Sequence, residues 1–287
     1  MRLGLKSLLF ILPALLYVGA VLLYPLIYNI SLSLHDVTFT SFIKGGSNWI
    51  GLQNYWTLRT DPQFIRTLFN TLIFLGGSIF FQFVIGFSLA LLFTKRFPLN
   101  NFLQGLIMLP WFVPIATSAI VFRWFFADAG LINSFLIGVG LIRTPINWIT
   151  SSKLAIISVT VANIWLGIPF NFIMLLTGLK AIPGELYECA AIDGAREWQK
   201  VVYISLPLLR NVIAATLILG SVLTIKVFDL VWLLTKGGPA GASHLLSTYS
   251  YSLAFERFRF GYSAAVILVM ILIVVVMMPL LNRIQME

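Results

Sequence analysis

Two opposite charges stand close together in an apolar run of this 287-residue chain. Lys226 and Asp229 lie three positions apart within residues 208–234, so a continuous helix would carry both on one face. A charge near the centre of a bilayer costs about 2.5 to 3.5 kcal/mol on insertion scales, so such residues usually pair or line a wet cavity. The spacing therefore admits two interpretations, a structural ion pair between helices and part of a solute pathway.

A second set of side chains has the chemistry of a polar-solute site. The apolar run 154–179 contains two amides and an aromatic ring, at Asn163, Trp165 and Asn171. Sites for sugars and similar solutes combine aromatic walls with a few polar groups that fix orientation. We therefore take these three residues, with Lys226 and Asp229, as candidates for lining a solute path.

Motifs for hydrolysis, metal binding and phosphate binding are absent from the sequence. Neither G-x-S-x-G nor H-E-x-x-H occurs, and no G-x-x-x-x-G-K-[ST] string could cradle a nucleotide. The single cysteine, Cys189, cannot form an intrachain disulfide, and His35 and His244 lack partners at metal-ligand spacing. We expect no catalysis, metal or cofactor in this chain, and any nucleotide to be bound elsewhere.

The composition indicates what kind of scaffold positions these residues. Hydrophobic residues make up 59% and charged residues 10%, with a mean hydropathy of +0.96. Average soluble domains have about 45–50% apolar and about 25% charged residues. The composition therefore excludes an ordinary soluble protein. The formal net charge of +9 does not indicate nucleic-acid binding, because Lys and Arg are scattered between apolar runs and are better explained as topology and interface anchors.

Six apolar runs are long enough to cross a bilayer as helices. The first is too long for the apolar core of a signal peptide. Pro110 and Pro114 in the third run, and Gly167 and Pro169 in the fourth, are more simply explained as kinks than as breaks that line a pathway. The sequence predicts an all-α polytopic membrane protein forming one transmembrane domain over residues 1–287. The six predicted spans cover about residues 8–34, 67–93, 102–126, 154–179, 208–234 and 262–281.

The distribution of positive charge predicts the orientation. Six spans place both termini on one side of the membrane. Lys and Arg are equally numerous on the two sides, but they are denser in the short segments on the side of the termini. Because positive charge concentrates in short cytoplasmic segments, we expect both termini in the cytoplasm.

The longest segment expected on that side, residues 180–210, is predicted to form two short helices outside the membrane. Pro183 suits a first helical turn, and Gly194 after Asp193 can adopt the left-handed conformation that ends a helix. The second helical pattern stops near Pro207. Without a partner, such a pair would be an amphipathic hairpin in the interface. Three small residues would let a partner approach closely: Cys189, Ala190 and Ala191.

Two strings in this half of the chain carry a family resemblance. YECAAIDGA (187–195), followed by ISLP (204–207), resembles the cytoplasmic EAA loop of the permeases of ATP-binding-cassette (ABC) importers. FDLVWLLTKGGPA (228–240), followed by SYSLAFERFRFGYSAA (250–265), resembles the Gly-Gly-Pro segment of sugar and glycerol-phosphate permeases, in the member that pairs with a different second permease. The departures are Cys189, where the family commonly has Ala, and Asn211, near a position often taken by Pro.

This resemblance implies the type I ABC importer permease fold. It also implies that residues 180–210 form a coupling-helix hairpin that inserts into a groove on a separate ATPase. Glu188 matches the motif Glu, which accepts a charge-assisted bond from the ATPase, and Gly194 matches the turn glycine. Asp229 matches the Phe-Asp position before the Gly-Gly-Pro turn. The residues implied at the ATPase contact are Glu188, Cys189, Ala190, Ala191, Asp193, Gly194, Leu206 and Pro207.

The resemblance further implies partners and a place. A second homologous permease, two ATPase subunits holding ATP and magnesium, and an extracytoplasmic solute-binding protein would complete an importer in the cytoplasmic (inner) membrane of a prokaryote. The solute would be a sugar, oligosaccharide or polyol derivative, moved by alternating access. Two alternatives remain open. An ion-coupled secondary transporter would have only Lys226 and Asp229 as coupling groups, and an integral-membrane enzyme would lack a polar catalytic constellation.

Overall fold

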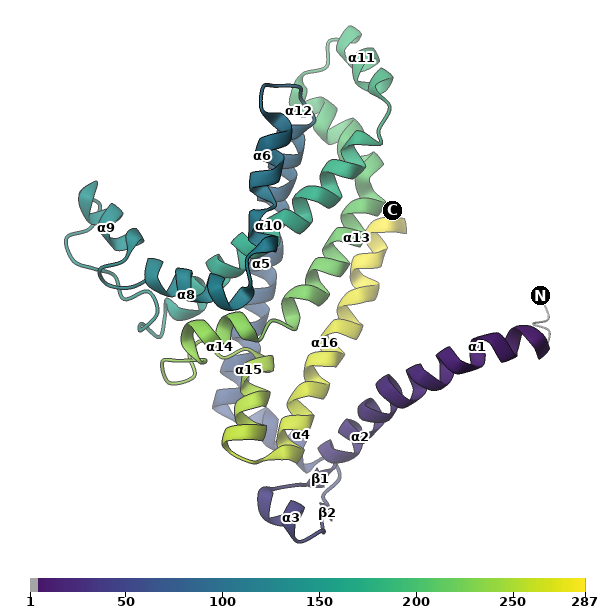
Figure 1. Ribbon diagram of the computed structural model, residues 1–287, viewed down its shortest axis with the longest axis vertical. Helices are drawn as coiled ribbons and strands as arrows, with labels where there is room; N and C mark the ends of the chain where they lie inside the picture. Colours follow the sequence, from purple (N-terminus) through teal and green to yellow (C-terminus); the bar gives the residue numbers. More distant parts are fainter. Residues whose placement is uncertain (1–4, 287) are drawn as a thin grey trace. The chain divides into compact units, whose positions relative to one another are not determined.

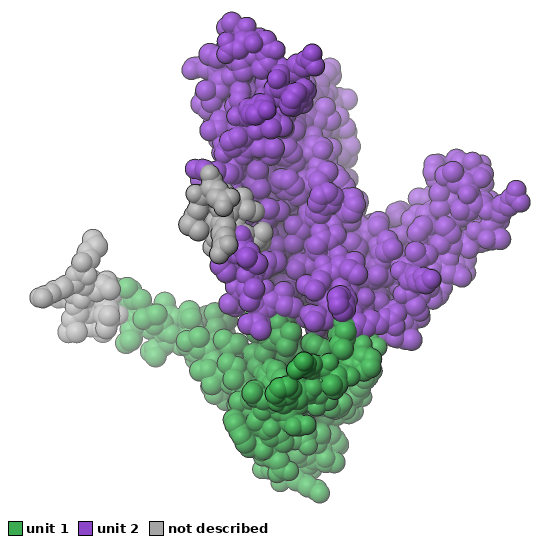
Figure 2. Space-filling view, turned by 180° about the vertical axis from the view of Figure 1, so that it is seen from behind, with its two compact units in different colours: residues 1–65, 249–271 green, residues 66–248, 272–287 purple. Residues whose placement is uncertain are grey.

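The structure is a computed structural model that describes residues 5–286, and its regular elements are almost all helices (Figure 1). The chain forms two compact units, coloured separately in Figure 2. Unit 1 comprises residues 1–65 and 249–271, and unit 2 comprises residues 66–248 and 272–287. Each unit is described below by itself, and the single-domain organisation stays a prediction.

Unit 1 begins with a long apolar helix made of three consecutive elements: α1 (Leu5–Val18), the π-helical turn η1 (Gly19–Leu23) and α2 (Tyr24–Ser33). The Tyr24 N–H bonds to the carbonyl of Gly19, five residues back, and this wider turn comes just before Pro25, which has no N–H to donate. The apolar window within Phe10–Ser33 has no buried residue, which suits a surface that faces lipid or another subunit.

The remainder of unit 1 consists of short elements joined by polar contacts. The two-residue strands pair antiparallel, with His35 opposite Trp49. Asn54 is buried and donates to the carbonyl of Ser33 at 2.8 Å. The elements are β1 (His35–Asp36), α3 (Phe39–Ile43), β2 (Asn48–Trp49), α4 (Gln53–Thr60), the π-helical turn η3 (Ser252–Glu256) and the first part of α16 (Phe260–Met286).

A carboxylate binds two buried tyrosines at the end of α4. The hydroxyls of Tyr249 and Tyr262, which are 1% and 3% exposed, each donate to Oδ2 of Asp61 at 2.8 Å. The backbone N–H of Gln63 donates to Oδ1 at 2.9 Å. Burial raises the pKa of Asp61, but these hydrogen bonds outweigh it and hold that pKa below its usual value. Asp61 thus joins the end of α4 to residues that lie 188 and 201 positions further along the chain.

Buried apolar side chains in unit 2 form clusters where its helices pack against one another. Phe74, Phe122, Val159 and Leu230 form one buried cluster, where α8 packs on α14. Phe172 belongs to a second cluster, where α10 packs on α13. The helices are α5 (Pro62–Phe93, from residue 66 on), α6 (Asn100–Ile107), α7 (Leu109–Phe112), α8 (Ile115–Phe125), α9 (Leu131–Gly138), α10 (Ala155–Lys180), α11 (Gly184–Ile192), α12 (Glu197–Lys200), η2 (Val201–Ser205), α13 (Leu206–Ile225), α14 (Asp229–Thr235) and α15 (Leu246–Tyr251, which ends in unit 1).

Within residues 5–286, five helices are long and apolar enough to cross a membrane. The stretch expected as the third span is instead divided into α6, α7 and α8, because Val113 is extended and Pro114 precedes α8 as its cap. Helix α10, by contrast, continues through Gly167 and Pro169, as a kink requires. A sixth span stays a prediction. The five helices cover Phe10–Ser33, Pro62–Phe93, Ala155–Lys180, Glu197–Ile225 and Phe260–Leu280.

The expected fifth span, residues 208–234, is not one helix. Helix α13 ends at Ile225, Lys226 caps it, and α14 starts at Asp229. The carbonyl of Val227 inside the break accepts a hydrogen bond from the Ser247 hydroxyl at 2.6 Å, so a group from another segment stabilises the interruption. The prediction that Lys226 and Asp229 share one helical face is therefore wrong.

The expected end of a short helix near Pro207 is also wrong. Residues Glu197–Ile225 form one helical run of 29 residues. The Leu206 N–H bonds to the carbonyl of Val201, five residues back, which makes η2 a π-helical turn. This wider turn lies next to Pro207, whose ring and missing N–H would otherwise interrupt the helix, so the helix passes the proline.

Candidate functional site

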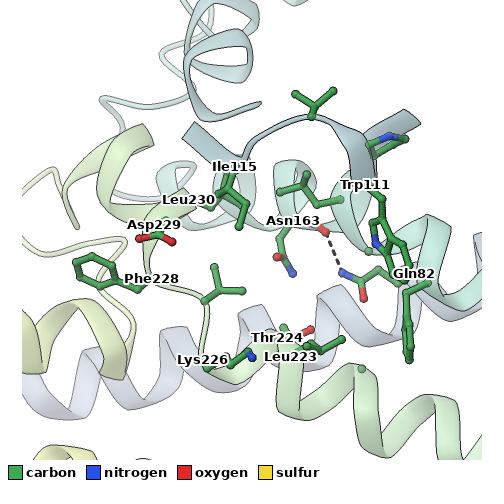
Figure 3. A pocket seen from close by; sticks show the side chains of 17 residues that line it. Gln82, Trp111, Ile115, Asn163, Leu223, Thr224, Lys226, Phe228, Asp229 and Leu230 are labelled. Atoms are coloured by element: carbon green, nitrogen blue, oxygen red, sulfur yellow. Dashed lines mark hydrogen bonds between the residues drawn. The ribbon is translucent and has the colours of Figure 1, made fainter. Parts of the chain in front are cut away.

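The break between α13 and α14 borders a cavity of about 550 Å³ within unit 2 (Figure 3). Its walls come from α5, α7, the start of α8, α10, the end of α13, the break itself and the start of α14. This volume lies in the range of about 300–1,000 Å³ that is typical of small-molecule sites. The polar and aromatic lining residues are Gln82, Asn163, Thr224, Lys226, Asp229, Trp111, Phe170 and Phe228.

Two nearly buried amides form the polar wall of this cavity. Gln82 and Asn163 are 3% and 5% exposed. Nε2 of Gln82 donates to the backbone carbonyl of Asn163 at 2.9 Å, and Nδ2 of Asn163 donates to the hydroxyl of Ser78 at 3.0 Å. A Cβ on Gly167 would lie 2.2 Å from Cδ of Gln82, so only glycine leaves room for this amide. The wall is therefore held in place by α5 and α10 together.

Aromatic rings form the flat part of the lining. The rings of Trp111 and Phe170 stack with centroids 6.2 Å apart and an interplanar angle of 24°. Phe228, in the break, stacks on Trp232 at 5.6 Å and 16°. Flat apolar faces beside fixed amides can bind a solute that has both apolar and hydroxyl-bearing surfaces.

Lys226 and Asp229 both line the cavity and are exposed within the isolated chain. Figure 3 shows them on the side formed by the break. Within residues 5–286, Lys226 and Asp229 do not form an ion pair with each other. The break therefore presents one positive and one negative group to the same space.

Two of the five sequence candidates lie elsewhere. Trp165 lines a smaller cavity with Leu106 and Pro110, and its ring meets Phe122 edge-on at 5.6 Å. Asn171 is 3% exposed and donates to the carbonyl of Gly167. The structure thus brings Asn163, Lys226 and Asp229 together but not Trp165 and Asn171.

Sequence reasoning did not single out Gln82, Trp111 or Phe228. A signal for Gln82 was present, because an amide interrupts the apolar run 67–93 just as Asn163 interrupts 154–179. Trp111 carried no such signal, and Phe228 entered only as the neighbour of Asp229 in the Phe-Asp position; the exposure of both rings to the cavity depends on the helix breaks beside them.

The segment expected to contact an ATPase, residues 180–210, includes α11, which lies past the C-terminal end of α10 (Figure 1). No residue of α11 is buried, and Ile192 is 86% exposed. Gly194 has φ +78°, which confirms the predicted left-handed conformation. The hydroxyls of Tyr187 and Ser205 lie 2.9 Å apart and connect α11 to η2.

The residues implied at an ATPase contact are mostly open to solvent. Glu188, Cys189, Ala191, Asp193 and Gly194 are exposed. Ala190 and Leu206 are half-buried, and Pro207, in the first turn of α13, is exposed. An exposed helix with an apolar residue such as Ile192 at its end offers a surface that a partner groove can cover.

The sequence and this architecture match a known family. Residues 82–285 match the family described as binding-protein-dependent transport system inner membrane component. Since the match covers well over half of the chain, the protein belongs to this family of membrane permeases.

Particular relatives are similar over most of their length. The trehalose/maltose transport system permease protein MalF of Thermococcus litoralis is 34% identical over 246 residues, which are 85% of this chain and 81% of that protein. The lactose transport system permease protein LacF of Rhizobium radiobacter is 31% identical over 251 residues, covering 86% and 82%. A chain of the bacterial alginate ABC transporter, solved in complex with its alginate pentasaccharide-bound periplasmic protein, has a TM-score of 0.80 and 26% identity, covering 96% of this chain and 92% of that one. These likenesses confirm the resemblance to ABC importer permeases.

Proposed function

We propose that this chain is the membrane-spanning permease subunit of an ABC importer that moves a carbohydrate delivered by a solute-binding protein. The observation that carries the proposal is its likeness, over most of the chain, to permeases of trehalose/maltose and lactose transport. The cavity between α5, α10 and the α13–α14 break supports it, because two fixed amides and stacked aromatic rings line one space.

The solute path in this proposal runs through that cavity. Gln82 and Asn163 would bind hydroxyl groups, and Trp111 would cover an apolar ring face. Lys226 and Asp229 would keep the cavity hydrated or contact the solute. Half of the complete path would belong to a second, homologous permease.

Coupling to ATP hydrolysis would take place at the hairpin that follows the C-terminal end of α10. Glu188 would accept a charge-assisted bond from an ATPase subunit, and the small residues Cys189 to Ala191 would let the groove of that subunit close on α11. ATP and magnesium would be held by two such subunits and not by this chain. ATP-driven closure would shift the inward-facing state toward the outward-facing one. Both termini would then lie in the cytoplasm, with six membrane spans.

Transport by the reconstituted assembly tests the proposal. The chain, its second permease, the ATPase and the binding protein are placed in liposomes, and uptake of labelled oligosaccharides is measured. Uptake should require ATP and the binding protein. Uptake by this chain alone, driven by a proton or sodium gradient, would instead identify an ion-coupled transporter. A thermal-shift screen of the binding protein against sugars selects the solute for the assay.

A matched pair of amide substitutions tests the cavity. Asn163→Ala removes an amide that lines the cavity, whereas Asn171→Ala removes one from the same helix that does not. Uptake should fall about tenfold in the first variant, since an unpaired polar solute group costs about 1–3 kcal/mol. It should remain near the wild-type value in the second. Equal losses in both variants would contradict the assignment of Asn163.

A further inference from the structure

Another cavity in unit 2 is bordered by two positive charges. It has a volume of about 390 Å³ and lies between the end of α8, residues 149–150, and the end of α14 with the turn that follows. Arg123, in the last turn of α8, and Lys236, the cap of α14, are the charged members of its lining. No carboxylate lines it, so the charged groups of its lining are all positive.

Neither cation is neutralised by the described part of the chain. The ion pairs found among residues 5–286 are those of Glu197 with Lys95 and Lys200, at the coupling hairpin. Asp128, the nearest acid after Arg123 in sequence, does not line the cavity and forms no ion pair within the described range. An anionic group in this cavity would be attracted by both cations.

The segment that carries Lys236 is held rigidly, which favours a binding role. Lys236 has φ +51° and Gly237 has φ +76°. The Ser243 hydroxyl donates to Oγ1 of Thr235 at 2.7 Å and also lies 2.6 Å from the carbonyl of Gly238. Asn70 of α5 donates to the carbonyls of Ala242 and His244. A fixed turn loses little conformational entropy when a partner binds.

The position of the cavity indicates which side of the membrane it faces. It lies beside residues 149–150, just before α10 starts at Ala155, whereas the coupling hairpin follows the end of α10 at Lys180. A helix of 26 residues is about 39 Å long, which is about the thickness of a bilayer. If the hairpin contacts the ATPase, as the proposed function requires, this cavity opens on the extracytoplasmic side.

We propose that the cavity between Arg123 and Lys236 receives an acidic side chain of the extracytoplasmic solute-binding protein when that protein docks. Charge complementarity selects this occupant: two cations without a carboxylate, on the side from which the binding protein arrives. The cavity has ample room for an Asp or Glu side chain, whose two oxygens can accept from the Arg123 guanidinium while Lys236 adds a third donor. This inference rests on the proposed function and names a contact within it.

Affinity measurements on the assembled transporter test the docking site. The dissociation constant between the solute-loaded binding protein and the complete permease–ATPase complex in nanodiscs is measured for Arg123→Gln, Lys236→Asn and the double variant. Asn replaces Lys236 because it tolerates the left-handed backbone there. Each single change should weaken binding about tenfold, and the double change should flatten the dependence of affinity on salt. Arg143→Gln, an exposed arginine outside the cavity, is the matched control and should bind like wild type.

The outcomes separate this inference from its rivals. An unchanged dissociation constant and salt dependence in the double variant, with the complex intact by co-purification, would overturn it. Unchanged docking combined with lost uptake of an anionic solute would assign the cavity to solute instead. A loss that appears only in nanodiscs containing anionic lipid would assign it to a lipid headgroup. Failure of the wild-type complex to take up any carbohydrate would count against the proposed function. The docking inference is judged separately, from the measured dissociation constants of the binding protein.

Discussion

Two segments of unit 2 carry the family motifs, and they are built in opposite ways. The Gly-Gly-Pro turn, residues 235–245, is largely buried and cross-linked by hydrogen bonds from Ser243 and Asn70. In the hairpin that is proposed to contact the ATPase, α11 has no buried residue. Both segments use a glycine at positive φ, Gly237 at +76° and Gly194 at +78°. The same backbone requirement thus serves internal packing in one segment and an exposed surface in the other.

Gly237 and Gly194 share a backbone conformation, yet substitutions at the two glycines should have different effects. Around Gly237, a Cβ would lie 2.1 Å from Nδ1 of the buried His244 ring, whereas nothing lies within 4 Å of a Cβ on Gly194. Substitutions in the turn should therefore act on folding. Substitutions in the hairpin should act on coupling.

The largest expected effect is on Gly237. Gly237→Ala combines a left-handed backbone with a collision against His244, so we expect at least about 3 kcal/mol of lost stability. Gly194→Ala meets no atom and should cost only the backbone strain, about 1 to 2 kcal/mol. Thermal unfolding of the two purified variants measures the difference. Equal losses would remove the contrast between the two segments.

The next effect concerns coupling without loss of stability. Glu188→Ala should abolish transport and weaken ATPase docking more than about tenfold, because a charge-assisted bond contributes about 1.5 to 3 kcal/mol. The unfolding midpoint should not change, since Glu188 is exposed. Transport at the wild-type rate with the ATPase still bound would show that Glu188 is a solvated surface charge.

A third substitution extends the contrast to the cavity wall. Gly167→Ala places a Cβ 2.2 Å from Cδ of Gln82 and should displace that amide, with a stability loss of about 1 to 3 kcal/mol and reduced solute uptake. Gly76→Ala in α5 is the control, because a Cβ there meets nothing within 4 Å. If Gly167→Ala transports like Gly76→Ala, the fixed position of Gln82 is not required.

The smallest effect is a pH dependence in unit 1. The pKa of Asp61 is lowered in the folded protein, so its hydrogen bonds to Tyr249 and Tyr262 stabilise the folded state at pH values above the unfolded-state pKa of about 3.9. This stabilisation is lost as the pH falls through the folded-state pKa. The difference in unfolding midpoint between wild type and Asp61→Asn should shrink below about pH 4. A difference independent of pH would mean that the carboxylate charge contributes nothing.

Local chemistry explains what could be predicted from sequence. Apolar runs of sufficient length located the helices around residues 67–93, 154–179 and 262–281, and the Asp193-Gly194 pair indicated the left-handed turn. These features depend on hydropathy and on a single backbone preference. They need no knowledge of distant contacts.

Tertiary contacts explain what could not be predicted. The break at Lys226 is stabilised by Ser247, twenty residues after the Val227 carbonyl that it contacts, so hydropathy alone made residues 208–234 look continuous. Pro207 looked like a helix end because a π-helical turn cannot be recognised from composition. Gln82 became a candidate only when Asn163 and Gly167 were found beside it.

The unbroken helical run Glu197–Ile225 connects the exposed hairpin to the large cavity. Its 29 residues span about 43 Å, with Glu197 in the coupling hairpin and Thr224 in the wall of the large cavity. A tilt of about 5° that pivots at the hairpin end would move Thr224 by about 4 Å. The π-helical turn beside Pro207 lies near the hairpin end of this run, and such turns are common sites of helix bending, so a small rotation there would be magnified at the cavity.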